Sequence, residues 1–270
     1  MKSIYFVLKE NITNFYRTIA IARYELMGDF RDTKLGFLWT LLNPIIQLFT
    51  YWLVFGIGIR GGRSVGHISF LPWMVVGMTV WFFVSPCITQ GVNCIYSKRN
   101  IITKMKFPVS ILPATVVFKE LFNHFWTFGL IVIILIVRGH VPNIYWLGCI
   151  YYMFATVCFC ISLNMITSVL NMFTRDVKKL VNATMRMLLY MTPILWTMET
   201  MAIEHPRLVM LLKLNPLYYI VEGYRGCLFF KDIFWHHPTQ TMYFWGLVLV
   251  MFTIGCILMY KFRSRFIDMM

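Results

Sequence analysis

Long apolar runs without charge alternate along the chain with short segments rich in cations. The first run, residues 36–59, holds 24 residues without a charged side chain. As a helix it would extend roughly 36 Å, enough to cross the ~30 Å hydrocarbon core of a bilayer. Comparable runs predict an all-α integral membrane protein with six transmembrane helices, over residues 36–59, 70–95, 113–137, 144–172, 181–198 and 241–260.

Two segments outside these runs have a different pattern. Residues 1–33 mix apolar and charged positions at helical spacing, which predicts an N-terminal amphipathic interface helix, or two short ones, on the membrane surface. A plain anchor and a docking surface for a cytosolic partner both fit. Residues 199–238 hold shorter apolar pieces broken by prolines, which predicts two exterior re-entrant half-helices between the fifth and sixth spans. The chain is thus one domain over 1–270: interface helix 1–33, six-span bundle 34–262 and cytoplasmic tail 263–270.

Polar and aromatic side chains recur every four residues on the predicted spans. This spacing places them on one helix face, and polar groups within a membrane normally face protein or water. Such stripes either line a translocation pathway or hold helices together, and periodicity alone does not separate the two. The candidate pathway residues are Trp39, Asn43, Gln47 and Tyr51 on the first span and Trp81, Phe82, Ser85, Thr89 and Asn93 on the second. A third stripe ends the fourth span at Asn164, Ser168, Asn171 and Arg175.

Composition and charge fit this interpretation. Hydrophobic residues make up 59% of the chain and charged residues only 13%, which is typical of polytopic membrane proteins. The net charge of +14 is unevenly placed, because 17 of the 25 Lys and Arg residues fall in segments predicted to be cytoplasmic. This positive-inside bias predicts that both termini lie in the cytoplasm. It also explains the charge as topology and attraction to membrane lipids, so no nucleic-acid partner is expected.

The sequence lacks the motifs of a catalytic, nucleotide or metal site. The glycine-rich run at 56–63 has the spacing of a phosphate loop, but Gly62 stands where the lysine should be. Inside the spans, Lys119 and Glu120 are interpreted as snorkelling to the interface, and His124 as an interior structural histidine. We therefore expect no enzyme and no cofactor or metal bound by this chain, so that any energy for uphill transport comes from a partner.

Four blocks in order, residues 35–44, 100–113, 175–196 and 215–225, resemble membrane subunits of ABC-2 type exporters of polysaccharides and polyol phosphates. The run 55–62 looks most like the teichoic acid translocation permeases of Gram-positive bacteria. The block at 100–108 departs from many relatives, which carry a second basic pair where this chain has Ile-Thr.

This resemblance implies a function in export. It implies a homodimer in the bacterial plasma membrane, joined by two copies of an ABC ATPase subunit that binds ATP and Mg. The implied substrate is a lipid-linked anionic polymer, here polyprenyl-diphosphate-linked wall teichoic acid, with O-antigen or capsular polysaccharide as the alternative. A membrane-embedded transferase acting on lipid-linked sugars is the alternative from another class, and it would depend on Asp29, Asp32 or Asp176.

The resemblance also assigns site residues. Cations near the cytoplasmic face would attract a polyanion, although topology alone explains them too; these substrate-entrance residues are Arg31, Lys34 and Lys98. The implied ATPase-coupling residues are Arg99, Asn100, Ile102, Lys104, Met105, Lys106, Phe107, Arg175 and Asp176. The implied outer gate comprises Asn215, Pro216, Tyr219, Glu222 and Arg225.

Overall fold

The computed structural model describes residues 2–31, 34–102, 107–198 and 205–263. Within these ranges the regular structure is helical, apart from one isolated β-bridge, so the all-α prediction is confirmed. Five helical stretches of the described residues are long and apolar enough to cross a membrane. They contain α3 (Leu38–Tyr51) with the π-helix η1 (Trp52–Ile59), α4 (Phe70–Gly91), η2 (Val109–Ile111) with α7 (Leu112–Val137), η3 (Ile144–Leu147) with α8 (Gly148–Phe173), and α13 (Pro238–Phe262).

The predicted fifth span is the element that differs most. A helix, α9 (Asp176–Met191), begins five residues before the predicted start at 181 and ends seven residues before the predicted end at 198. Its 16 residues extend about 24 Å, less than the ~30 Å hydrocarbon core. The helix ends because Thr192 precedes Pro193 and adopts an extended conformation with ψ 134°. The structure therefore does not confirm a sixth full-length span.

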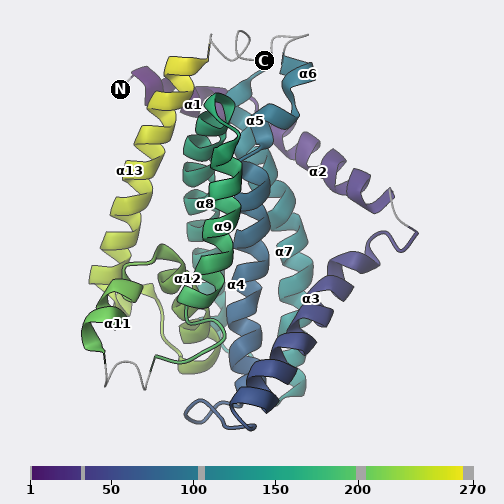
Figure 1. The fold of residues 1–270 in the computed structure, drawn as a ribbon, viewed down its shortest axis with the longest axis vertical. Coiled ribbons are helices and arrows are strands. Elements are labelled where there is room, and N and C mark those ends of the chain that lie inside the picture. Colours follow the sequence, from purple (N-terminus) through teal and green to yellow (C-terminus); the bar gives the residue numbers. More distant parts are fainter. Residues whose placement is uncertain (1, 32–33, 103–106, 199–204, 264–270) are drawn as a thin grey trace.

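Helix α4 forms the centre of the bundle and α3 lies at its margin. Within their most apolar windows, 78% of the α4 residues are buried, against 11% for α3 with η1. Helices α7, α8, α9 and α12 (Pro216–Arg225) pack around α4, and α13 packs against α8 (Figure 1). The hydrophobic core thus belongs to α4 and its neighbours, while α3 keeps most of its apolar surface outside the bundle.

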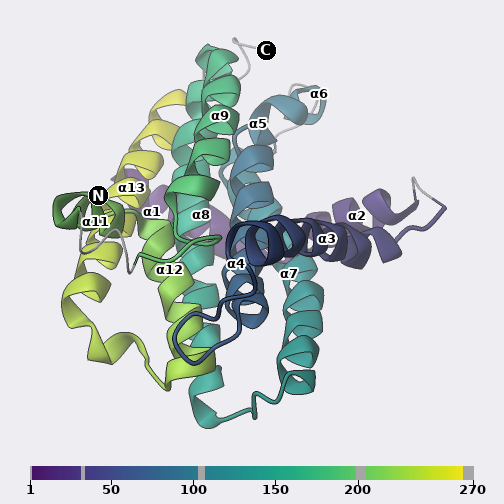
Figure 2. The same cartoon turned by 60° about the horizontal axis from the view of Figure 1, so that its bottom comes forward.

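The N-terminal segment forms two helices, α1 (Lys2–Thr13) and α2 (Phe15–Arg31). The Phe6 ring of α1 lies 5.5 Å from the Tyr260 ring of α13 between centroids, so the first and last described helices meet at one end of the bundle. Helix α2 packs against α7 through its buried residues Thr18, Ala22 and Leu26. Figure 2 shows α2 and α3 on the same side of the bundle, next to α7.

The segment before α13 contains short helices, as predicted. These are α11 (Pro206–Lys213), α12, the π-helix η4 (Gly226–Phe230) and the 3₁₀-helix η5 (Phe234–His236). Each of α11 and α12 begins with a proline, which suits the first helical position, and Asn215 caps α12 by accepting the Leu217 N–H at 3.0 Å. Helix α12 packs closely on α8 because Gly223 has no side chain: a Cβ there would lie 2.1 Å from Tyr152 Cε1. Their re-entrant placement in a membrane stays a prediction.

Candidate functional site

Six of the nine predicted pathway residues of the first two spans line one cavity. This membrane pocket, of about 620 Å³, lies between α2, α3, α4 and α7. Helix α3 contributes three of the four residues of its stripe. Helix α4 faces them across the cavity with the first residues of its own stripe. The predicted residues that line it are Trp39, Asn43, Gln47, Trp81, Phe82 and Ser85.

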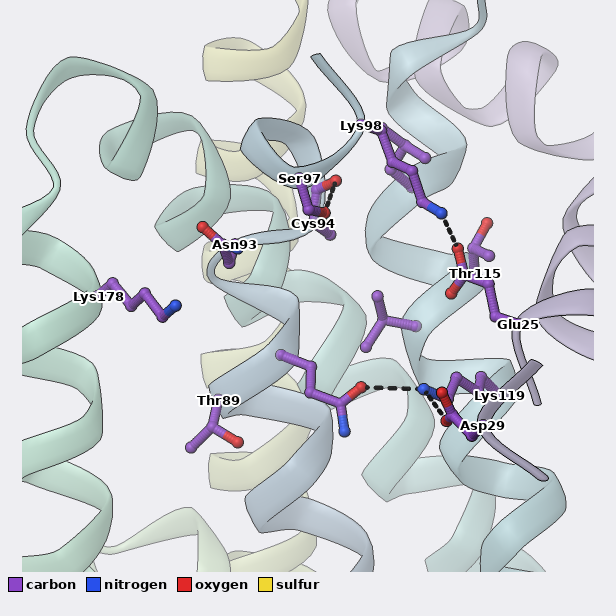
Figure 3. A pocket seen from close by; sticks show the side chains of 13 residues that line it. Glu25, Asp29, Thr89, Asn93, Cys94, Ser97, Lys98, Thr115, Lys119 and Lys178 are labelled. Atoms are coloured by element: carbon purple, nitrogen blue, oxygen red, sulfur yellow. Dashed lines mark hydrogen bonds and ion pairs between the residues drawn. The ribbon is translucent and has the colours of Figure 1, made fainter. Parts of the chain in front are cut away.

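A second cavity adjoins the first along the next turns of α4. This lysine pocket, of about 430 Å³, lies between α2, α4, α7, α9 and the short helix α5 (Cys94–Ser97). It contains the other two residues of the second predicted stripe, Thr89 on α4 and Asn93 just before α5, and three cations, Lys98, Lys119 and Lys178 (Figure 3). The α4 stripe therefore lines two successive cavities. Tyr51 lines neither cavity and packs, half-buried, against the core.

A cluster of charges, two buried and one exposed, lies between the two cavities. Lys119 Nζ lies 2.6 Å from Asp29 Oδ2 and 3.9 Å from Glu120 Oε1, and it donates to Gln90 Oε1 at 3.3 Å. Lys119 is 8% exposed and Glu120 5%. Both side chains are thus buried and have partners within the protein, so they do not extend into water as snorkelling side chains would. Their depth in the membrane stays a prediction.

The polar stripe of α8 makes contacts between helices, which is the alternative to lining a pathway. Asn164 is buried and donates to the carbonyl oxygen of Cys87 on α4 at 3.0 Å. Asn171 is buried too and donates to Asn93 Oδ1 at 3.4 Å. Gly91 permits the close approach of Asn164 to α4, because a Cβ at position 91 would lie 2.1 Å from Asn164 Nδ2. The α8 stripe thus holds helices together.

The short helix α6 (Arg99–Ile102) and the start of α9, which hold most of the described coupling residues, lie at the end of the bundle where α1 meets α13 (Figure 1). The guanidinium groups of Arg99 and Arg175 each lie 4.7 Å from the centre of the Tyr96 ring, and Arg175 also donates to the Tyr96 hydroxyl. Tyr96 thus joins the segment that holds Arg99 to the turn between α8 and α9 that holds Arg175. We call these two segments the coupling loops. The sequence analysis missed Tyr96. The other coupling residues differ in exposure: Asn100 is exposed, Ile102 is buried, Phe107 is half-buried, and Asp176 is exposed and pairs with Lys179 at 3.1 Å. Lys104, Met105 and Lys106 lie outside the described residues.

The three predicted entrance cations do not share one cavity. Lys98 lines the lysine pocket and pairs with Glu25 Oε1 at 2.6 Å. Arg31 lines a concave surface on the other side of α2, beside Arg23 and Tyr24. Lys34 is exposed in the turn before α3.

Most of the predicted outer-gate residues form a network around the end of α9. Arg225 is 1% exposed; it donates to the carbonyl oxygens of Pro193 at 2.7 Å and Ile194 at 3.1 Å, and to Glu222 Oε1 at 2.7 Å. Its guanidinium carbon lies 3.4 Å from the centre of the Trp73 ring. Asn215 donates to Thr192 Oγ1 at the end of α9, and Pro216 begins α12. Tyr219 lies outside this network: its hydroxyl contacts those of Tyr151 on α8 and Thr241 on α13.

The remaining candidate residues do not form a catalytic or metal site in the described part of the chain. Asp29 pairs with Lys119 and Asp176 with Lys179, so the two described acids proposed for a transferase share no cavity. His124 is buried, its Nε2 lies 3.1 Å from the Tyr224 hydroxyl, and its ring stacks on Phe83 at 4.5 Å, as an interior histidine should. No group of three metal-ligating side chains occurs among the described residues.

Comparison with known proteins supports the interpretation as a transporter subunit. The model of the ABC-2 type transporter family matches residues 16–229. An O-antigen export system permease protein RfbA of Myxococcus xanthus is 28% identical over 219 residues, covering 81% of this chain and 80% of the relative. A protein of the same name from Klebsiella pneumoniae is 24% identical over 253 residues, covering 93% and 94%. The chain is a multi-pass membrane protein and belongs to the ABC-2 type transporter family.

Proposed function

We propose that this chain is the membrane subunit of an ATP-driven exporter of a lipid-linked polysaccharide of the O-antigen class. The names of relatives that span most of the chain favour this alternative over a wall teichoic acid polymer. The support for teichoic acid as the substrate is the short glycine-rich run at 55–62. An exporter of the same kind could also carry that polymer. ATP hydrolysis belongs to a separate subunit with its own ATP and Mg.

The polar face of α4 is the observation that carries the proposal. Successive turns of this face line the membrane pocket and then the lysine pocket, so a polar route runs along a helix that is otherwise buried. In a bilayer, such a face has to meet protein or water. A hydrated polymer passing along α4 satisfies that requirement.

A homodimer in the plasma membrane completes the route in this proposal. The outer surface of α3 with η1 exposes large apolar side chains, including Ile46, Phe49 and Ile57, and a second copy would cover part of that surface. The first and last described helices meet at one end of the bundle, which supports an even number of crossings. We therefore propose that α9 and residues 192–198 act as the fifth of six crossings, with both termini cytoplasmic.

The cytoplasmic contact with the ATPase subunits is proposed at the two loops joined by Tyr96. Arg99 and Arg175 come from different segments and both lie 4.7 Å from the centre of the same ring, so an ATPase that contacts either segment acts on both. Replacing Lys104, Lys106 and Phe107 together should uncouple ATP hydrolysis from export. Unchanged export would contradict this assignment.

The test of the proposed function is depletion of the protein in its own cells. We expect a polyprenyl-diphosphate-linked polysaccharide to accumulate in the cytoplasm, and mass spectrometry of that lipid separates O-antigen from teichoic acid. The purified chain should hydrolyse no ATP until its ATPase subunit is added. ATP hydrolysis by the chain alone, or export unaffected by depletion, would refute the proposal.

A variant pair tests the route along α4. Ser85→Trp fills the membrane pocket and should abolish export, whereas Ile254→Trp, at an exposed position on α13, should leave export intact. Both variants should be checked for normal membrane insertion and monodispersity, so that loss of folding is not mistaken for a blocked route.

A further inference from the structure

We infer that the lysine pocket binds the diphosphate group of the lipid-linked substrate, through Lys98, Lys119 and Lys178. This inference rests on the proposed export function and adds a site to it. The evidence lies in the geometry, charge and burial of the residues that line the pocket.

The three ammonium groups approach the cavity from three different elements. Lys98 directly follows α5, Lys119 belongs to α7, and Lys178 projects from α9 on the opposite side of the pocket (Figure 3). Gln90, Asn93 and Ser97 add neutral hydrogen-bond donors to the lining. The volume of about 430 Å³ falls within the range of about 300–1,000 Å³ of small-ligand sites. The cavity is therefore suited to an anion with several oxygen acceptors.

The charge balance of the pocket is positive. Its lining contains three lysines but only two carboxylates, Glu25 and Asp29, and both carboxylates belong to α2. Lys98 pairs with Glu25 and Lys119 with Asp29, each at 2.6 Å. Lys178 has no ion pair or hydrogen bond among the described residues. Glu120, which lies outside the lining, is 3.9 Å from Lys119 and adds to the compensation of that lysine only. Lys178, an exposed side chain at the cavity, is thus the cation of the lining that has no carboxylate partner among the described residues, and it would attract an anion.

The burial of the pairs indicates which partner leaves when the anion binds. The Lys119 side chain is 10% exposed, whereas that of Asp29 is 57% exposed. Asp29 can turn into water at little cost, but a buried ammonium without a partner is strongly unfavourable. A diphosphate can therefore replace Asp29 at Lys119 while the lysine stays in place. Binding would then weaken one of the two ion pairs that hold α2 to the bundle.

The neighbouring lysines of α9 provide a matched pair for the test. Both lysines are exposed, but Lys178 lines the pocket, whereas Lys179 pairs with Asp176 at 3.1 Å. The full-length chain in phosphatidylcholine nanodiscs would be titrated with farnesyl diphosphate, followed by ³¹P NMR or calorimetry. We expect saturable binding that Lys178→Gln weakens about tenfold, as for loss of a charge-assisted contact, and that Lys179→Gln leaves unchanged. Equal effects of the two substitutions would overturn the site.

A second variant separates the site from a merely structural role. Asp29→Asn removes the competitor for Lys119, so farnesyl diphosphate should bind several-fold more tightly, which damage to the fold would not produce. Weaker binding by this variant would contradict the exchange at Lys119. Inorganic diphosphate and farnesol serve as the other probes, and equal affinity for inorganic diphosphate would overturn the lipid-linked source.

The outcomes also separate this site from the proposed function. If depleted cells accumulate the lipid-linked polysaccharide but farnesyl diphosphate does not bind, the site is wrong and the function stands. If farnesyl diphosphate binds in the lysine pocket but depletion leaves export unaffected, the function is wrong and the site stands.

Discussion

Lys119 and Arg225 are two buried cations with different kinds of partner. Arg225 is held by two backbone carbonyl oxygens, one carboxylate and the Trp73 ring. Lys119 is held by the side chains of Asp29, Glu120 and Gln90. Carbonyl oxygens cannot leave without moving the backbone, whereas a half-exposed carboxylate can rotate away. The comparison indicates that Arg225 fixes the fold around α12, and that Lys119 can exchange one partner for another.

The largest effect is expected from breaking the Arg225 network. Arg225→Gln removes the guanidinium from Glu222 and from two buried carbonyl oxygens, and each buried acceptor left unpaired costs about 1–3 kcal/mol. The thermal midpoint in detergent should fall strongly. Arg207→Gln, which changes an exposed arginine on α11, is the control and should leave the midpoint unchanged. If both variants unfold alike, Arg225 does not fix the fold.

A smaller effect is expected from crowding the same network. A Cβ at Gly77 would lie 2.7 Å from Arg225 Nη2 and 3.3 Å from Ile194 Cγ2, so Gly77→Ala should destabilise the protein by about 1–3 kcal/mol. Gly129→Ala on α7 is the matched control, because no atom lies within 4 Å of its Cβ position. Its higher helix propensity should leave stability equal or raised. Thermal unfolding of the two variants measures this difference. An equal loss of stability in Gly77→Ala and Gly129→Ala would contradict the tight packing around Arg225.

A still smaller effect on stability is expected at the other cation. Asp29→Asn leaves Lys119 with Glu120 and Gln90, and pairs with an exposed partner contribute about 0–1 kcal/mol. The thermal midpoint should therefore change little. A loss as large as that of Arg225→Gln would mean that Asp29 cannot exchange.

The smallest effect is expected from an ion-pair cluster outside the membrane-spanning helices. Burial by itself raises the pKa of Asp232, but hydrogen bonds from His237 and His236 outweigh it and hold the pKa below its ordinary value. A lowered carboxyl pKa stabilises the fold above the ordinary pKa and loses this contribution as the pH falls through the lowered value. Between about pH 5 and about pH 3 the thermal midpoint should fall slightly less in Asp232→Asn than in the unmodified protein. An identical pH dependence would show that the cluster contributes nothing.

The sequence predicted those parts of the site that depend on helical periodicity. Residues four apart on α3 and α4 share a face whatever the neighbouring helices do, and the structure brings most of them to the membrane pocket. The same spacing on α8 led to a different contact, because Gly91 lets Asn164 approach α4 closely. Periodicity identifies a polar face, and only the packing of helices decides what that face meets.

The parts that the sequence analysis missed depend on contacts between distant residues. Asp29 and Lys119 are 90 positions apart, and α2 was assigned to the membrane surface, so no pairing between them was predicted. One feature of the sequence could have indicated this pairing. Glu25 and Asp29 lie one turn apart, on a helix whose buried face includes Ala22 and Leu26. The early end of α9 had a clearer signal, because Pro193 disfavours helix at the residue before it.

The Tyr96 ring has a mechanical consequence for the proposed ATPase contact. The ring and the hydroxyl of Tyr96 engage Arg99 and Arg175, which are about 75 positions apart, and Tyr96 itself lies on α5, the short helix that follows α4. A force applied to either loop therefore reaches the helix that lines both cavities, through a single side chain. Removing that ring would leave each loop in place but make the two move independently.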